Sequence, residues 1–357
     1  GTCTFYGTAN SNQVLMEMLG VQLPGSSFLH TDDPLRPAMT RRTVEALMSC
    51  TADSGTYRPL ARVICEESIV NAVVALLATG GSTNHALHMV AIARAAGIEL
   101  ELADFDELSQ AVPLLARIYP NGSADINDFQ RAGGMAFLVR ELRSGGLLNE
   151  SVVNVLGNDL DAWCAVPEPD AKGGVSWTST VETSADTTVL ATVTAPFADE
   201  GGLRRLQGNL GECVIKVSAV DEEHHSLTAP CRVFHSQEEL KHAFEAGEME
   251  RDMIAVVRFQ GPSANGMPEL HKMTPFLGIL QDRGFKVALV TDGRMSGASG
   301  KVPAAIHLSP EAAQGGPIAL LRDGDVIELD AHNGVLNAQV PLAEWQQRSP
   351  AVAPVVQ

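Results

Sequence analysis

The feature that most constrains the fold of this chain is a change in the spacing of its apolar residues near residue 185. Before that point apolar residues recur every three or four positions, as Val14 and Met18 do, which is typical of amphipathic helices. Beyond it, short apolar segments such as 253–259 (MIAVVRF) alternate with turn residues, which is typical of strands. The change predicts two domains of different architecture, 1–185 and 186–357.

The first domain is predicted to be rich in helices. Asn10 or Ser11 is a suitable N-cap for the first of them. The helical spacing covers residues 10–20, 40–50, 66–78, 82–97 and 128–145, the last with a break at its Gly133-Gly134 pair. Proline, aspartate and glycine in 163–174 (WCAVPEPDAKGG) predict a loop.

The second domain is predicted to be dominated by strands with a few helices between them. The expected strands are 189–195, 213–220, 253–259, 286–292 and a hairpin over 326–340 that turns at Asn333-Gly334. Ser236 and Glu239 form a capping box before one helix, and Pro268 opens another that reaches Gly284. We therefore expect an α/β protein in which the helix-rich remainder of an N-terminal α/β domain precedes a β-barrel-like C-terminal domain with covering helices.

Length and charge exclude several classes of protein. With 357 residues, 45% of them hydrophobic, the chain can bury a substantial core. Its net charge of -18, from 25 basic and 43 acidic residues, argues against nucleic acid as a partner because phosphate binding needs clustered lysine and arginine. The longest apolar run, 69–78, is interrupted by Asn71 and is too short to span a membrane. No secretory leader pattern is visible, so we expect a cytoplasmic protein.

One of the six cysteines differs from the others in its surroundings. The chain contains no Cys-x-x-Cys pair and is too long for a disulfide scaffold, so a cysteine here is expected to be a small buried hydrophobe. Cys3 instead lies among glycine, threonine, alanine and asparagine in GTCTFYGTAN. A core thiol normally has apolar neighbours, which makes Cys3 a candidate for chemistry.

Three glycine-flanked polar segments are the other candidates. In 78–85 (ATGGSTNH), backbone amides at a helix start could bind an anion, or the segment could simply connect two helices. In 261–272 (GPSANGMPELHK), Glu269 should lie in a first helical turn, where it either suits the helix dipole or binds Mg²⁺. Segment 291–301 (TDGRMSGASGK) follows an apolar strand, and its serine lacks the spacing of a hydrolase nucleophile elbow.

Together these segments resemble the dihydroxy-acid and sugar-acid dehydratase family. The resemblance covers nearly the whole chain and points to a sugar-acid member, because branched-chain members carry CGGMYTAN where this chain has CTFYGTAN. It is carried, in chain order, by GTCTFYGTAN, ATGGSTNH, DFQRAGGM, GNLGECVIKVSAV, VVRFQGPSANGMPEL and LVTDGRMSGASGKVPAAIHLSPEA.

The resemblance implies two cofactors and roles for individual residues. Cys3 would be one ligand of an iron-sulfur cluster, with [4Fe–4S] favoured over [2Fe–2S], and Glu269 would bind Mg²⁺. Ser296 would be the general base, acting as an alkoxide beside a metal. The remaining ligands would lie in a segment before Gly1, so this chain alone is expected to be inactive. Candidates for the substrate's phosphate are Ser82, Thr83, Asn84, Arg294 and Lys301.

The activity implied is dehydration of 6-phospho-D-gluconate to 2-dehydro-3-deoxy-6-phospho-D-gluconate, a step of the Entner–Doudoroff pathway. Two alternatives remain open. One is a dehydratase of another 2,3-dihydroxy acid, either a branched-chain acid or a nonphosphorylated aldonate. The other is a noncatalytic fragment that binds sugar acids. The resemblance also implies that the protein is a homodimer. Its expected binding partner is a small phosphorylated sugar acid, and neither nucleic acid nor a membrane is expected as a partner.

Overall fold

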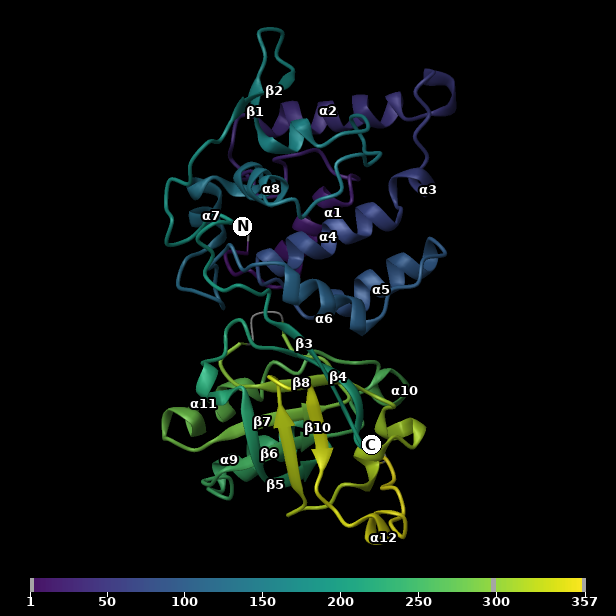
Figure 1. Cartoon of the computed structure of the whole chain (residues 1–357), viewed down its shortest axis with the longest axis vertical. Coiled ribbons are helices and arrows are strands. Elements are labelled where there is room, and N and C mark those ends of the chain that lie inside the picture. The colour runs from purple at the N-terminus through teal and green to yellow at the C-terminus, as the bar shows by residue number, and fades with distance from the viewer. Residues whose placement is uncertain (1–2, 297–299, 355–357) are drawn as a thin grey trace. The chain divides into compact units, whose positions relative to one another are not determined.

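The computed structural model describes residues 3–296 and 300–354, and the chain divides into two compact units, Gly1–Gly202 and Leu203–Gln357 (Figure 1). The first unit is mainly helical and the second contains a closed barrel, which confirms the predicted fold class.

The boundary between the units falls later than residue 185, because 186–202 pairs with the first unit. Ala191 N donates to Leu115 O at 2.8 Å, and Phe197 N donates to Leu114 O at 2.9 Å. The strand predicted over 189–195 is wrong: this segment forms only an isolated bridge, between Leu190 and Ala116.

Helices of the first unit surround one buried helix. They are α1 (Thr8–Met18), α2 (Arg36–Ser49), α3 (Leu60–Val63), α4 (Glu66–Ala78), α5 (His85–Ala95), α6 (Leu102–Ala111), α7 (Ile126–Ala132) and α8 (Gly134–Ser144), with short 3₁₀ turns η1 (Ala52–Ser54) and η2 (Asp161–Cys164). The predicted N-cap of α1 is wrong, because Gly7 occupies that position. The Ser11 hydroxyl donates instead to Gly7 O at 2.8 Å, inside the helix.

Helix α4 is the centre of this unit. It packs against α1, α5, α6 and α8 (Figure 1), and every residue from Ser68 to Ala78 is buried except the partly buried Val70. Asn71, the polar residue in its apolar run, is fully buried and exchanges hydrogen bonds with the backbone of Asn149, at 3.0 and 2.8 Å. None of the helices in the described parts of the chain combines the length and apolar character needed to cross a membrane.

A β-hairpin replaces the loop predicted over 163–174. Strands β1 (Ala165–Pro169) and β2 (Val175–Thr180) pair antiparallel. The turn between them is held by Asp170, whose carboxylate accepts from Lys172 N at 2.7 Å and from Gly174 N at 2.8 Å. Prolines in β1 hide the strand pattern in the sequence, but they are tolerated in a two-stranded ribbon because each strand has a free edge.

Glu17 is a carboxyl group buried in the core of the first unit. It is fully inaccessible, and its carboxylate accepts hydrogen bonds from Gly25 N at 2.8 Å, from Ser27 N at 3.2 Å and from the Ser27 hydroxyl. Burial raises the pKa of Glu17 to about 7, and these hydrogen bonds reduce the shift only in part.

We expect Glu17→Gln to remove a pH dependence of stability. Because the folded pKa lies above that of the unfolded chain, the folded protein holds this proton more tightly, and stability falls as pH rises from about 4.5 to about 7. The loss over this window should be on the order of 3 kcal/mol. Urea unfolding at pH 5 and pH 7.5 would measure it, and equal pH dependence in the two proteins would contradict the assignment.

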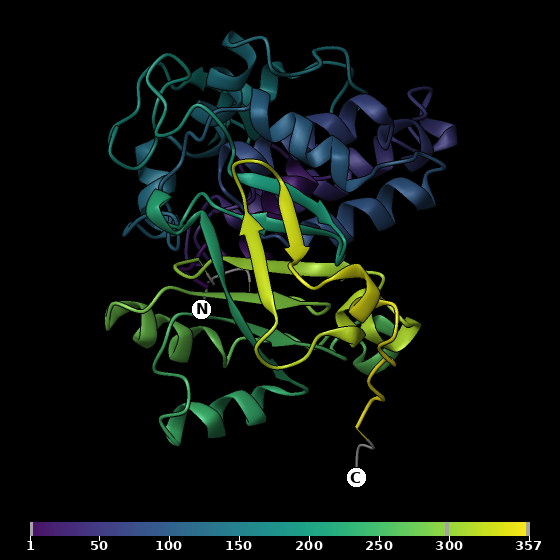
Figure 2. The same ribbon diagram turned by 60° about the horizontal axis from the view of Figure 1, so that its bottom comes forward.

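The second unit is an eight-stranded closed barrel. Its strands are β3 (Leu203–Gly208), β4 (Gly211–Lys216), β5 (Ser226–Phe234), β6 (Met253–Val257), β7 (Val287–Thr291), β8 (Ala304–Ser309), β9 (Val326–Asp330) and β10 (Val335–Ala338). Their order around the barrel is β10-β3-β4-β8-β7-β6-β5-β9. Figure 2 shows these strands in a view turned by 60° about the horizontal axis from that of Figure 1. The predicted hairpin is present as β9 and β10. Strands β5, β6, β7 and β8 are parallel neighbours, so their carboxyl ends lie at one edge of the barrel.

Helices and short turns lie on the outside of the barrel. They are α9 (Gln237–Glu245), α10 (Pro262–Asn265), α11 (Thr274–Asp282) and α12 (Leu342–Trp345), with 3₁₀ turns η3 (Glu222–His224), η4 (Ala312–Gln314) and η5 (Pro317–Leu320). Ser236 caps helix α9 by accepting from Glu239 N, but the return bond of the predicted capping box is displaced by one residue, because Glu239 Oε2 accepts from His235 N at 2.7 Å. Helix α11 packs on β7. Ile254 and Val256 point into the barrel core while the rest of β6 is also buried, which explains its uninterrupted apolar run.

The helix predicted over 268–284 begins six residues later, at Thr274. Pro275 lies in its first turn and sets its start. Glu269 therefore lies in an extended segment before the helix, and its predicted place in a first helical turn is wrong.

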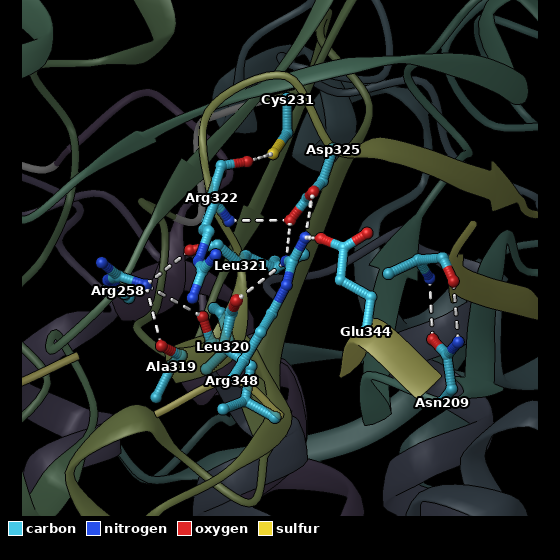
Figure 3. Close-up of polar contacts among 12 residues, drawn as sticks. Asn209, Cys231, Arg258, Ala319, Leu320, Leu321, Arg322, Asp325, Glu344 and Arg348 are labelled. Carbon is cyan, nitrogen blue, oxygen red and sulfur yellow. Dashed lines mark hydrogen bonds and ion pairs between the residues drawn. The ribbon is translucent and has the colours of Figure 1, made fainter. Parts of the chain in front are cut away.

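Two arginines, Arg258 and Arg348, bind the backbone of segment 319–321 in the second unit (Figure 3). Arg348, buried after α12, pairs with Asp325 and with Glu344, and its Nη1 donates to Leu320 O at 3.1 Å. Arg258, at the end of β6, donates to Ala319 O at 3.1 Å and to Leu321 O at 3.0 Å. Backbone carbonyls of one segment, 319–321, are thus bound from two sides.

Candidate active site

Two loops of the second unit meet beyond the carboxyl ends of β6 and β7. The loop after β6 carries Glu269 and the loop after β7 carries Ser296. An isolated parallel bridge joins Glu269 to Arg294, and Leu270 N donates to Arg294 O at 3.1 Å. Arg294 Nε donates to Met267 O at 2.8 Å. The structure therefore brings three predicted residues, Glu269, Arg294 and Ser296, to one pair of loops.

The side chains on these loops differ in accessibility. Glu269 is exposed, as a carboxylate that binds a metal from solvent must be, and Ser296 is half-buried. Lys301 is exposed and its Nζ lies 3.6 Å from Asp282 Oδ1, an ion pair that contributes little because both side chains are in water. Its ammonium group can therefore turn toward an anion at small cost.

A buried carboxylate lies beneath the two loops. Asp292, which follows β7, is 1% exposed and accepts hydrogen bonds from the backbone N–H groups of Phe259, Gln260 and Ala312, at 3.1, 2.9 and 2.9 Å. Burial raises the pKa of Asp292 above its ordinary value, against the effect of these three donors. The sequence analysis did not single out Asp292, although a carboxylate directly after an apolar strand is a usable signal.

In the first unit, Cys3 lies on an exposed turn that is held by Asn10. The Asn10 side-chain amide donates to the carbonyls of Cys3 and Phe5, each at 2.7 Å. Tyr6 N donates to Tyr119 O, and Ile126 N donates to Thr4 O, each at 3.0 Å. These two backbone hydrogen bonds hold the turn against segment 119–126. The Cys3 thiol is exposed, in contrast to Cys164, Cys213 and Cys231, which are buried. Asn10 acts here as a support for the cysteine turn and not as the helix cap predicted.

The segment 78–85 forms a buried polar network. Ser82, Thr83 and Asn84 are all less than a tenth exposed. Ser82 N donates to the Ser11 hydroxyl at 3.3 Å, and Asn84 N donates to the Ser82 hydroxyl at 3.2 Å. These two amides of the predicted anion site already have partners within the protein. Burial lowers the pKa of His85 to about 3, so its imidazole is neutral while it bonds to the Ser11 hydroxyl at 2.8 Å.

The residues that are present suit the two implied cofactors. Cys3 offers a solvent-facing thiol, the soft ligand that iron-sulfur clusters use. Glu269 offers an exposed carboxylate, the hard ligand that Mg²⁺ uses. Within residues 3–296 and 300–354, no three His, Cys, Asp or Glu side chains are grouped closely enough to share a metal ion.

Comparison with known proteins identifies the family. The N-terminal and C-terminal models of the dihydroxy-acid/6-phosphogluconate dehydratases match residues 1–163 and 188–357. The chain therefore belongs to this family of hydro-lyases, as the sequence resemblance predicted.

The similar curated proteins are more specific. Phosphogluconate dehydratase of Pseudomonas aeruginosa is 60% identical over 99% of the chain, and that of Escherichia coli K12 is 53% identical over 99%. Dihydroxy-acid dehydratase of Sulfurisphaera tokodaii is 36% identical over 98% of the chain. The chain spans 58% of the length of the two phosphogluconate dehydratases and 60% of the third relative.

Proposed function

We propose that this chain carries the proton-transfer and Mg²⁺-binding residues of a dehydratase that converts 6-phospho-D-gluconate to 2-dehydro-3-deoxy-6-phospho-D-gluconate. The observation that carries the proposal is the pairing of the Glu269 and Ser296 loops at one edge of the barrel. The relatives at 53% and 60% identity are phosphogluconate dehydratases, which supports the choice of substrate.

The reaction removes a proton from C2 and hydroxide from C3 of the acid. Ser296, as its alkoxide, takes the C2 proton and becomes a neutral hydroxyl, while Glu269, on the adjoining loop, would hold Mg²⁺. When bound, an iron-sulfur cluster and Mg²⁺ supply Lewis acidity to the 3-hydroxyl and to the carboxylate end of the substrate. Loss of the proton and of hydroxide leaves an enol, which ketonises to the 2-keto acid. Cys3 is proposed as one cluster ligand.

The phosphate of the substrate needs a cationic or amide-rich site. Lys301 and Arg294 lie on the same loop as Ser296 or just beyond it, and they are proposed as its cationic ligands. Ser82, Thr83 and Asn84 remain proposed as a further anion site. A homodimer and a cytoplasmic location belong to the same proposal.

Substrate preference tests this proposal. In the longest chain that the gene encodes, we expect kcat/KM for 6-phosphogluconate to exceed that for gluconate and for 2,3-dihydroxyisovalerate by at least about 100-fold, since charge-assisted contacts to phosphate are lost with the other acids. Formation of the 2-keto acid would be measured for each. Equal or higher turnover of dihydroxyisovalerate would favour the activity named for the Sulfurisphaera tokodaii relative, and binding without turnover would favour a noncatalytic role.

A further inference from the structure

Three residues of the second unit adopt a left-handed backbone conformation, with positive φ, that residues other than glycine rarely adopt. They are the only non-glycine residues with positive φ in the described parts of the chain: Phe259 at 63°, Met267 at 52° and His307 at 59°. Such residues are strained and persist only where the surrounding structure holds them. Phe259 and Met267 both lie in the connection after β6, on either side of α10, and His307 lies in β8.

Each strained residue is bonded to the same tripeptide, Asp292-Gly293-Arg294. Phe259 N donates to Asp292 Oδ2 at 3.1 Å. Arg294 Nε donates to Met267 O at 2.8 Å, and His307 N donates to Gly293 O at 2.9 Å. One short segment, two residues before Ser296, therefore holds all three.

The packing around this tripeptide is tight. A Cβ atom at Gly293 would lie 2.7 Å from Gln260 Cβ and 2.8 Å from Leu270 Cδ1, so only glycine fits between the two loops. The Asp292 carboxylate adds bonds to Gln260 N and Ala312 N, which bring in the segment after β8. The relative position of Glu269 and Ser296 thus depends on the contacts that Asp292 and Gly293 make with the two loops.

We propose that Asp292 is a positioning residue for the reaction: its buried carboxylate fixes the segments after β6, β7 and β8 so that Glu269 and Ser296 keep one geometry. The inference rests on the proposed function. A carboxylate suits this task because it accepts from several backbone N–H groups at once and contributes no competing donor. A shift of about 1 Å between reacting groups can cost about 100-fold in rate.

The test compares Asp292→Asn with a matched control, Asp325→Asn. Asp325 is also a buried carboxylate of the barrel, but it bonds to Arg348 and makes none of the contacts above. In the longest chain that the gene encodes, we expect Asp292→Asn to lower kcat for 6-phosphogluconate by about 10- to 100-fold with KM changed by less than about 3-fold. Asp325→Asn should lower the temperature of unfolding and leave kcat, measured well below that temperature, unchanged.

Amide hydrogen exchange gives a readout that does not need activity. We expect Asp292→Asn to speed exchange at Phe259, Gln260 and Ala312 while the strand amides of the barrel stay protected. Equal losses of kcat in Asp292→Asn and Asp325→Asn would reduce Asp292 to a structural role. Unchanged kcat and exchange in Asp292→Asn would mean that its carboxylate does not hold these segments, and either result overturns the proposal.

If Asp292→Asn does not fold, Asp292→Glu replaces it as the test. Asp292→Glu keeps the charge and the acceptor oxygens but moves them by one methylene group, and full kcat in this variant overturns the proposal. If the unaltered protein does not turn over 6-phosphogluconate, the proposed function fails. The exchange measurement then still decides whether Asp292 holds the segments.

Discussion

Ser296→Ala should lower kcat for 6-phosphogluconate by at least about 100-fold, because positioned proton transfer contributes about 10²- to 10⁴-fold to enzyme rates. The variant removes one hydroxyl group from a half-buried loop position and opens no cavity in the core. Its temperature of unfolding should therefore stay within about two degrees of the unaltered protein, since substitutions of this kind change stability by about 0.5 kcal/mol or less.

The matched control is Ser226→Ala. Ser226 is an exposed serine of β5 whose hydroxyl donates to Asp330 Oδ1 at 2.8 Å, so it also loses one hydroxyl and one hydrogen bond. Steady-state turnover of both variants would be compared in the longest chain that the gene encodes. Near-normal turnover in Ser296→Ala would exclude Ser296 as the base, and a loss in Ser226→Ala would show that the assay responds to stability.

Arg348→Met should cause the largest loss of stability in the second unit. The Arg348 side chain is 4% exposed and that of Asp325 is 10% exposed, so removing the guanidinium leaves a carboxylate with little water and without its hydrogen-bonded cation (Figure 3). Partial burial is the largest influence on the pKa of Asp325 and acts to raise it, but the hydrogen bonds from Arg348 and from Arg322 N, together with the charges of these two arginines, hold the pKa below its ordinary value. Breaking a buried pair from one side costs about 3 to 5 kcal/mol.

Arg283→Met is the control for this loss. Arg283 pairs with Glu250, but both side chains are half-exposed, at 50% and 53%, so the pair should contribute less than about 1 kcal/mol. Urea unfolding would give the free energy of unfolding of each variant. Equal losses in the two would mean that burial of Arg348 does not matter.

The sequence predicts local structure best where one segment carries all the information. Helix α4 begins and ends where expected, at Glu66 and Ala78, because its apolar run is bounded by polar residues and a Gly-Gly turn. Strands β3, β5 and β8 were not predicted. Strand β3 carries adjacent arginines and β5 carries a proline, and all three become strands through partners from distant parts of the chain.

The candidate site divides in the same way. Ser296 and Glu269 could each be found from glycine-flanked segments, but their pairing through Arg294 is a tertiary contact that no local pattern reports. Asp292 could not be predicted for a similar reason. Its carboxylate accepts from three backbone N–H groups, and these lie on segments that only the folded barrel brings together. The number of backbone N–H groups of segment 78–85 that could bind an anion was overestimated, because Ser82 N donates to the hydroxyl of Ser11, a residue of another helix.

The closure of the barrel has a consequence for synthesis on the ribosome. Strand β3 opens the second unit, yet one of its neighbours is β10, through the pair Gln207 and Val335. A nascent chain must therefore keep one side of β3 unpaired until nearly the whole unit has emerged. Unpaired strand edges invite association between chains. Translation that stops before Val335 should consequently yield aggregated product, whereas a stop after Arg348, which keeps both β10 and the Asp325 pair, should yield a closed barrel.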